Sequence, residues 1–335
     1  MAMDSKVTSP SVIEDVPAGH CGPLDHPLRW QVGLPLLALL VLFPFAANAL
    51  DGGFYVSLAS RILILAIAAT SLNLILGFGG MVSFGHAAFL GVGAYTVAIL
   101  MQAGVTSAVL SFPLAVLLSG AGAAAIGAIS LRTRGVSFIM ITLAFAQMLY
   151  FLAVSLKAYG GDDGLSLAGR STLPGGLSLA GDTPFYFACL TVSVLVFVAV
   201  HRLVNSRFGH ALQAIRENET RMEAIGFPVF RLKLAAFVIA GALAGLAGAL
   251  TANHASFVSP SMMQWSQSGM LMIMVILGGV GYLWGGVVGA LVFLVLEEIL
   301  SHYTIHWQFF LGAALLAVVL AAPNGLMSLF DRRPR

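Results

Sequence analysis

The longest charged stretch of this chain reads SRFGHALQAIRENETRMEAIGFPVFRLK and covers residues 206–233. It lies between two hydrophobic segments that are each long enough to cross a bilayer, and it is too short to be an independent domain. Because charged side chains are costly in the hydrocarbon core, the stretch predicts a loop outside the membrane, which we bound at 205–233. We interpret this charged loop as a docking element through which a separate motor moves the membrane part.

The composition around the charged loop indicates a membrane protein. Of the 335 residues, 59% are hydrophobic and only 9% are charged, whereas a soluble domain carries about a quarter charged residues. Several segments run for roughly twenty residues almost without charge, which is the length that spans the hydrocarbon core. They are not the alternating segments of about ten residues that build a β-barrel. The predicted fold class is therefore an all-α polytopic membrane protein.

Ten apolar runs lie within residues 29–328, which we assign as one transmembrane domain with a helix on each run. The eighth run is short and ends in glycines, so a broken helix is an alternative to a full crossing. Residues 1–28 lack the basic start and early apolar core of a signal peptide and predict a disordered cytoplasmic tail. Residues 329–335 form a basic cytoplasmic tail. The predicted spans are 30–50, 54–77, 84–103, 107–131, 136–156, 184–204, 234–255, 268–281, 285–302 and 305–322.

The positions of lysine and arginine predict the orientation, because cytoplasmic loops of membrane proteins are enriched in both. With the N-terminus inside, 13 of the 16 basic residues fall on the cytoplasmic side. Only Lys157 and Arg170 then fall outside, and Arg61 lies within a span. We therefore predict a multi-pass membrane protein with both termini cytoplasmic. The charged loop is then cytoplasmic, and the loop 157–183 faces outward.

Two short helices joined at a corner are predicted within the charged loop. The first covers about 208–216, and either Asn218 or Thr220 can cap the second. Thr220 and Glu223 have the spacing of a capping box. Gly226 suits the end of the second helix, because glycine adopts the left-handed conformation that terminates helices.

The second short helix carries two apolar positions, Met222 and Ile225, that suit a groove on a partner protein. Neighbouring charged side chains would give charge complementarity and fix the register of such a contact. The alternative is an amphipathic loop that rests on lipid headgroups, as basic amphipathic segments commonly do. The charged side chains are Glu217, Glu219, Arg221 and Glu223.

A glycine-rich segment, SLNLILGFGGMVSFGHAAFLGVGAY, covers residues 71–95. Glycines at this density allow close helix packing or an unwound stretch that lines a cavity. The polar side chains among them favour a translocation pathway, because polar groups at membrane depth usually face the protein interior or water. Packing alone is the alternative. The candidate pathway residues are Asn73, Gly77, Gly79, Ser83, Gly85, His86, Gly91, Gly93 and Tyr95.

Two further glycine clusters predict close packing. Gly241, Gly245 and Gly248 mark one face of the predicted span 234–255. The glycines between 278 and 289 surround Trp284 and predict a tight turn, either re-entrant or between two helices.

Three charged residues lie near or within predicted spans: Arg61, Glu297 and Glu298. Because a charge inside a membrane is costly and often functional, the adjacent carboxylates suggest proton coupling. The alternative is that both carboxylates lie at the outer end of their span and reach water, since neighbours on a helix point about 100° apart.

The chain lacks the motifs of an ATPase or a metal enzyme. A phosphate-binding loop needs Gly-Lys followed by Ser or Thr, and none of Lys6, Lys157 and Lys233 follows a glycine. The eight histidines are scattered and form no H-E-x-x-H pattern, and G-x-S-x-G is absent. We therefore predict no metal site, no cofactor in this chain and no nucleic-acid partner.

Three separated stretches carry a family resemblance: SLNLILGFGGMVSFGHAAFLGVGAYTVAIL, FGHALQAIRENETRMEAIGFPVFRLKLAAFVIAGALAGLAGAL and ILGGVGYLWGGVVGALVF, with APNGL near the end. In this order they resemble the permeases of bacterial branched-chain amino acid ABC importers, over roughly residues 55–328. The segment SFGHAAFLGVGAY, residues 83–95, resembles the LivM-type subunit rather than its LivH-type paralogue. The first 28 residues and the loop 165–183 have no counterpart, and Tyr159 stands where the family usually has threonine.

The resemblance implies the fold of a type II ABC importer permease with short cytoplasmic coupling helices. It implies a location in the bacterial inner membrane, with the loop 157–183 in the periplasm. It also implies assembly, within membrane lipid, with a LivH-type permease, two cytoplasmic ATP-binding subunits that bind ATP and Mg, and a periplasmic substrate-binding protein. It also implies that the charged loop inserts into a cleft of the ATPase. The predicted contact residues are Arg216, Glu217, Glu219, Arg221, Glu223, Ala224 and Gly226.

The function that the resemblance implies is ATP-driven import of branched-chain, hydrophobic amino acids by a subunit that is not itself an enzyme. Because affinity can reside in the binding protein, we expect a weak, largely apolar channel near residues 73–95 without a fixed charge clamp. Alternatives are the same architecture importing urea, short amides or another small solute, and a proton-coupled secondary transporter that uses Arg61 with Glu297 or Glu298. A membrane-embedded enzyme or scaffold is a further class, but it lacks a convincing polar cluster here.

Overall fold

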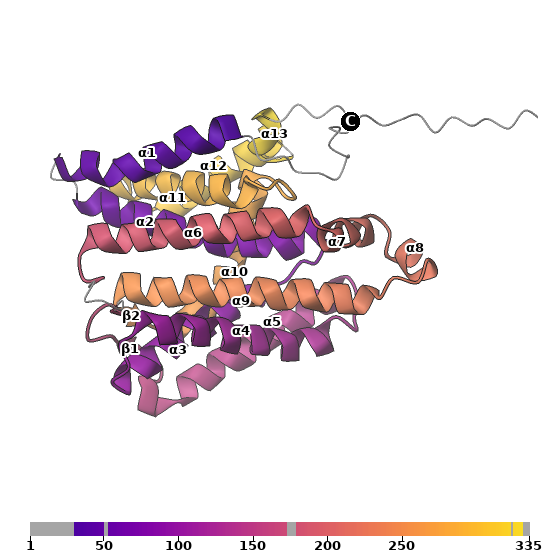
Figure 1. Cartoon of the computed structure of the whole chain (residues 1–335), viewed down its shortest axis with the longest axis horizontal. Coiled ribbons are helices and arrows are strands. Elements are labelled where there is room, and N and C mark those ends of the chain that lie inside the picture. The colour runs from indigo at the N-terminus through magenta and orange to yellow at the C-terminus, as the bar shows by residue number, and fades with distance from the viewer. Residues whose placement is uncertain (1–29, 50–52, 173–178, 323, 331–335) are drawn as a thin grey trace, which may run out of the picture.

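The computed structural model describes residues 30–49, 53–172, 179–322 and 324–330. The predicted N-terminal tail and residues 331–335 of the predicted C-terminal tail lie outside these ranges. Helices form most of the described chain, and the long central ones run side by side (Figure 1). The helices are α1 (Trp30–Ala49), α2 (Gly53–Asn73), α3 (His86–Gln102), α4 (Ala108–Ser130), α5 (Val136–Ser155), α6 (Asp182–Val204), α7 (Arg207–Glu217), α8 (Glu219–Ala224), α9 (Val229–Ala255), α10 (Trp265–Gly278), α11 (Gly285–Tyr303), α12 (Trp307–Ala321) and α13 (Met327–Phe330).

Within the described ranges, six helical segments are long and apolar enough to cross a membrane: α4, α5, α6, α9, α11, and α2 with its π-helical continuation Leu74–Phe78. The other four predicted spans coincide with shorter apolar helices, which are Leu37–Ala47 within α1 and the helices α3, α10 and α12. Helix α10 has 14 residues, or about 21 Å, against a hydrocarbon core of roughly 30 Å. The helical, multi-pass class therefore holds, and the count of ten crossings stays a prediction.

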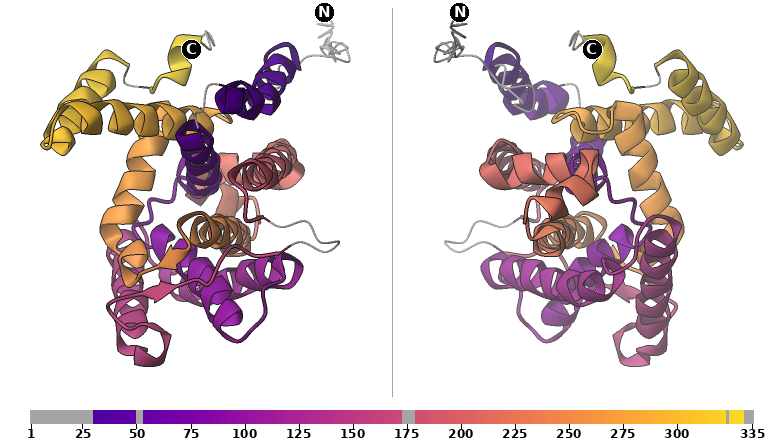
Figure 2. Two further views of the ribbon diagram at one scale, coloured as in Figure 1. Left: turned by 90° about the vertical axis from the view of Figure 1, so that its left-hand side faces the viewer. Right: turned by 90° about the vertical axis from the view of Figure 1, so that its right-hand side faces the viewer.

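Helices α2 and α9 form the centre of the bundle. Helix α9 packs against α2, α3 and α4, and α2 also packs against α6, α10 and α11; Figure 2 shows this arrangement along the bundle. A Cβ atom at Gly248 would collide with the Leu90 carbonyl of α3, and one at Gly245 would collide with Ser119 of α4. Gly241 meets Ala123 of α4 in the same way. The predicted close-packed glycine face is confirmed.

A tight turn joins α10 to α11. Gly279 and Gly281 have φ values of 122° and 81°, which side chains other than glycine rarely adopt. A Cβ atom at Gly278 would collide with the carbonyl of Gly285, where α11 begins. Trp284 packs against Phe197 of α6 in a tilted arrangement, with ring centroids 4.3 Å apart. The predicted turn around the tryptophan is therefore confirmed.

The two polar loops lie at opposite ends of the bundle. Strand β1 (Leu165–Ser166), in the loop 157–183, pairs antiparallel with β2 (Phe257–Val258), which follows α9. The Asn253 side chain near the end of α9 accepts a hydrogen bond of 2.7 Å from the Ser171 amide and fastens the same loop. Helices α7 and α8, from the charged loop, lie at the other end (Figure 1). This separation agrees with the prediction that the two loops face opposite sides of a membrane.

Candidate functional site

The charged loop folds into the two predicted short helices. Helix α7 is capped by Ser206, whose hydroxyl accepts from the Gly209 amide, and α8 is capped by Asn218, whose side chain accepts from the Arg221 amide at 2.9 Å. Of the two predicted cap residues, Asn218 is therefore the one used. The predicted capping box of Thr220 is wrong, because α8 already begins at Glu219.

Charged side chains of α8 bind the neighbouring elements of the same chain. Arg134, in the turn between α4 and α5, lies 2.9 Å from Glu223 and 3.5 Å from Glu219. Lys233 at the start of α9 lies 2.6 Å from the second oxygen of Glu219. Because Arg134 is largely exposed, its pairs are screened by water and hold the helix weakly. Two of the predicted partner-contact residues thus have partners within this chain.

The corner after α8 exposes apolar side chains. Ile225 is 64% exposed and Phe227 is 45% exposed, and the neighbouring Ala224 and Gly226 are also exposed. Met222, in contrast, is only 7% exposed and packs with Ile215 and Val229. The interpretation of Met222 as a surface anchor is therefore wrong, because this side of α8 covers the start of α9. Phe227 is an exposed residue that the sequence analysis missed.

The charges predicted for the partner contact separate into bound and unbound groups. Glu217 and Arg221 are exposed on the loop, so they are accessible to a partner. Arg216 is exposed as well, but its Nη1 donates a hydrogen bond to the Gly77 carbonyl of the π-helical segment. Its aliphatic stem covers Gly80, where an added Cβ would lie 3.1 Å from Cγ of the arginine.

The π-helical segment is in turn tied to the turn between α10 and α11. Asn73 is buried; its Nδ2 donates to the Tyr282 carbonyl at 2.8 Å, and its Oδ1 accepts from the Gly281 amide at 3.1 Å. Gly77 leaves room for this contact, since an added Cβ would collide with Asn73 and Gly281. Arg216 and Asn73 therefore join three elements: the charged loop, the end of α2 and the α10–α11 turn. We call this set of contacts the inner junction.

The nine candidate pathway residues are all buried in this chain. His86 lies with Nε2 2.8 Å from the Ser71 hydroxyl, and the Ser83 hydroxyl accepts from the Gly85 amide. Added Cβ atoms would collide with Met263 at Gly91 and with the Gly245 carbonyl at Gly93. Similar close approaches surround the remaining glycines. These contacts favour the packing alternative for the segment 71–95 within a single chain.

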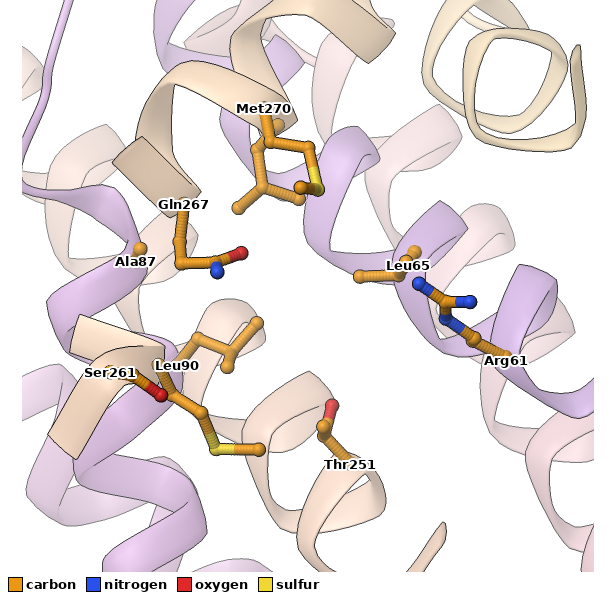
Figure 3. A pocket seen from close by; sticks show the side chains of 10 residues that line it. Arg61, Leu65, Ala87, Leu90, Thr251, Ser261, Gln267 and Met270 are labelled. Carbon is orange, nitrogen blue, oxygen red and sulfur yellow. The ribbon is translucent and has the colours of Figure 1, made fainter. Parts of the chain in front are cut away.

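A cavity of about 250 Å³ lies between α2, α3, α9 and α10, towards the end of the bundle that carries the β strands (Figure 3). None of the nine candidate pathway residues lines it. Its polar lining consists of Arg61, Thr251, Ser261 and Gln267, and the rest is mainly leucine and methionine. Arg61 pairs with Glu297 of α11 at 3.0 Å. We refer to this space as the Arg61 cavity.

The Arg61–Glu297 pair bears on the two interpretations of the adjacent carboxylates. Glu297 faces α2 and is mostly buried, with a side-chain exposure of 14%. Glu298 is partly exposed and has no ion pair in the described part of the chain. The alternative in which both carboxylates simply reach water therefore fails for Glu297, because its charge is balanced by an arginine on another helix.

Known permease proteins of branched-chain amino acid transport are similar to this chain. A family model described as branched-chain amino acid transport system, permease component, matches residues 54–320. The high-affinity branched-chain amino acid transport system permease protein LivM of Salmonella typhimurium is 28% identical over 318 residues, which cover 88% of this chain and 74% of that protein. The permease protein LivH of the same organism is 25% identical over 283 residues, or 78% of this chain and 90% of that protein.

No solved structure matches the chain. LivM of Escherichia coli is 28% identical over 315 residues, or 87% of this chain and 73% of that protein. Since the family model covers most of its length, the chain belongs to the family of branched-chain amino acid transport system permease components.

Proposed function

We propose that this chain is the LivM-type permease subunit of an ATP-driven importer for branched-chain amino acids. The observation that carries the coupling role is the inner junction, in which Arg216 connects the charged loop to Gly77. The loop thus has one face bound to the transmembrane helices and one exposed corner at Ile225 and Phe227. This is the arrangement that a lever between a motor and a membrane domain requires.

The proposed assembly contains four further components. They are a LivH-type permease, two cytoplasmic ATP-binding subunits that hold ATP and Mg, and a periplasmic substrate-binding protein. The chain crosses the inner membrane ten times with both termini and the charged loop in the cytoplasm. The positive-inside distribution of lysine and arginine supports this orientation, and the opposite placement of the two polar loops agrees with it.

In the proposed mechanism, ATP binding closes the ATP-binding subunits and moves the α8 corner. Exposed Glu217, Arg221 and Glu223 set the register of that contact by charge, and Ala224, Ile225 and Gly226 fill the cleft. Helix α7 follows and carries Arg216, which shifts the π-helical segment and the α10–α11 turn. The flanking helices then tilt, and access changes from the outer to the inner side.

Transport by the assembled complex in lipid vesicles tests the coupling role. Arg216→Met should lower ATP-dependent leucine uptake several-fold while ATP hydrolysis continues, because the motor then turns over without moving the inner junction. Arg207→Met is the matched control, since Arg207 is an exposed arginine on the same helix. An unchanged ratio of leucine transported to ATP hydrolysed in Arg216→Met would contradict the proposal.

The same vesicles separate the alternatives. Uptake driven by a pH gradient without ATP would identify a proton-coupled secondary transporter instead. ATP-dependent uptake of urea or a short amide, without leucine uptake, would keep the architecture and change the substrate.

A further inference from the structure

The Arg61 cavity has the chemistry of a site for a small molecule with one acidic and one apolar end. Figure 3 shows the Arg61 guanidinium and the Gln267 amide pointing into the same space from α2 and α10. Leu65, Leu90 and Met270 supply apolar walls. The volume of about 250 Å³ lies just below the roughly 300–1,000 Å³ of pockets for drug-sized ligands. The space therefore suits a molecule of amino-acid size.

Arg61 keeps hydrogen-bond donors available in this cavity. An arginine carries five N–H donors, and in the described part of the chain the hydrogen-bond partner of Arg61 is Glu297, through Nη2. The Arg61 side chain remains 43% exposed. Arg61 lies about 12 Å along α2 from Gly53. The helix is otherwise apolar, and a charged residue within such a helix is costly and often marks a ligand or ion pathway.

Glu297 restricts the kind of ligand that Arg61 can accept. The ion pair is neutral as a whole, so a bound zwitterion adds no net charge to the membrane interior, whereas a dianion would. The second carboxylate oxygen of Glu297, Oε2, is buried without a hydrogen-bond partner. Glu297 itself does not line the cavity, so it balances the charge of Arg61 from the α11 side and leaves Arg61 as the charged group that faces a ligand.

We propose that the Arg61 cavity binds an aliphatic amino acid on its way through the membrane, with the substrate carboxylate on Arg61 and its side chain against Leu65, Leu90 and Met270. The proposal rests on the transport function above and adds the group that recognises the substrate inside the permease. The proposal differs from the expectation of an apolar channel near residues 73–95 without a charge clamp, because the Arg61 cavity contains one cationic side chain. Arginine suits this role because its planar donors match a carboxylate bidentately.

Protection of an introduced cysteine tests the site directly and without the binding protein. Ser261 lines the cavity and is exposed, so Ser261→Cys in a Cys21→Ser, Cys189→Ala background should react with a thiol reagent. L-Leucine should slow the reaction in the assembled complex, and 4-methylpentanoate should do so as well, because it keeps the carboxylate. L-Leucinamide lacks the carboxylate and should protect at least about ten-fold less well, as expected for the loss of a charge-assisted contact.

Substitutions in the same background complete the test. Arg61→Gln should weaken protection by leucine about ten-fold or more, and Arg61→Lys should restore part of it. Ser266→Cys is the control for labelling, since Ser266 is exposed at the start of α10, five positions after Ser261, but does not line the cavity. Leucine should not protect this cysteine. Equal protection by leucine and leucinamide, or full protection in Arg61→Gln, would overturn the proposal.

Two further results keep this proposal distinct from the proposed function. Leucine uptake by the unmutated complex without any protection of Ser261→Cys would refute the cavity and leave the transport function intact. The absence of ATP-dependent leucine uptake would refute the transport function itself. Protection that needs anionic lipid rather than leucine would assign Arg61 to a lipid headgroup and also overturn the proposal.

Discussion

Replacing Asn73 by alanine should disconnect the end of α2 from the α10–α11 turn. The side chain makes two hydrogen bonds, to the Tyr282 carbonyl and from the Gly281 amide, and it is 1% exposed. Net contributions of about 0.5–1.5 kcal/mol for each bond give a loss of about 1–3 kcal/mol in the free energy of unfolding. We expect the same variant to lower the ratio of leucine transported to ATP hydrolysed.

A second buried asparagine provides the matched control. Asn253 accepts from the Ser171 amide and donates to the Ala249 carbonyl, but it lies at the end of the bundle away from the charged loop. Asn253→Ala therefore removes the same number of hydrogen bonds and should lower stability by a similar amount. It should leave the transport ratio unchanged, because it does not touch the inner junction.

The measurements are unfolding of the detergent-purified complex and paired uptake and ATP hydrolysis in vesicles. A lower melting temperature for both variants, with a lower transport ratio for Asn73→Ala alone, is the expected result. If both variants destabilise the protein and neither changes the ratio, the inner junction is structural and the reasoning is refuted.

Two further predictions concern the corner of the charged loop and the glycine face of α9. Ile225→Glu should leave the permease folded, because the Ile225 side chain is 64% exposed. It should abolish co-purification of the ATP-binding subunits with the permease. Co-purification at the normal yield would contradict the docking role of the corner. Gly248→Ala should lower the free energy of unfolding by about 3 kcal/mol, at the upper end of the overpacking range, because its Cβ meets the Leu90 carbonyl. Gly122→Ala is the control, since Gly122 has open space around it. Equal melting temperatures for these two variants would refute the packing argument.

Length and hydropathy were sufficient to predict where the helices lie. Each predicted span coincides with an apolar helix, because a run of about twenty apolar residues has few stable alternatives to a helix in a membrane. The two short helices of the charged loop also followed from local signals. The choice between Asn218 and Thr220 as the cap could not be made, since it depends on the conformation of a single residue at the start of α8.

The functional residues depended on partners that are distant in the sequence. Glycine density in 71–95 is compatible with both a packed helix and a cavity wall, because both need small side chains. Only the neighbours decide, such as Met263 at Gly91. Arg61 was visible as a charge in an apolar span, but its partner Glu297 lies 236 positions away. No local pattern contains that pairing.

The charged loop and the Arg61 cavity are connected by two continuous helices. Helix α2 carries Arg61 in the cavity and Asn73 in the inner junction, 12 positions or about 18 Å apart. Helix α9 begins within the last residues of the charged loop, at Val229, and carries Thr251 in the cavity wall, 22 positions or about 33 Å further along. Long helices curve gently and kink sharply only at specific breaks, so a tilt imposed at the loop is carried to the cavity. Opposite displacements of these two helices would change the separation of Arg61 and Thr251, which supplies the proposed motor with a direct way to release a bound amino acid.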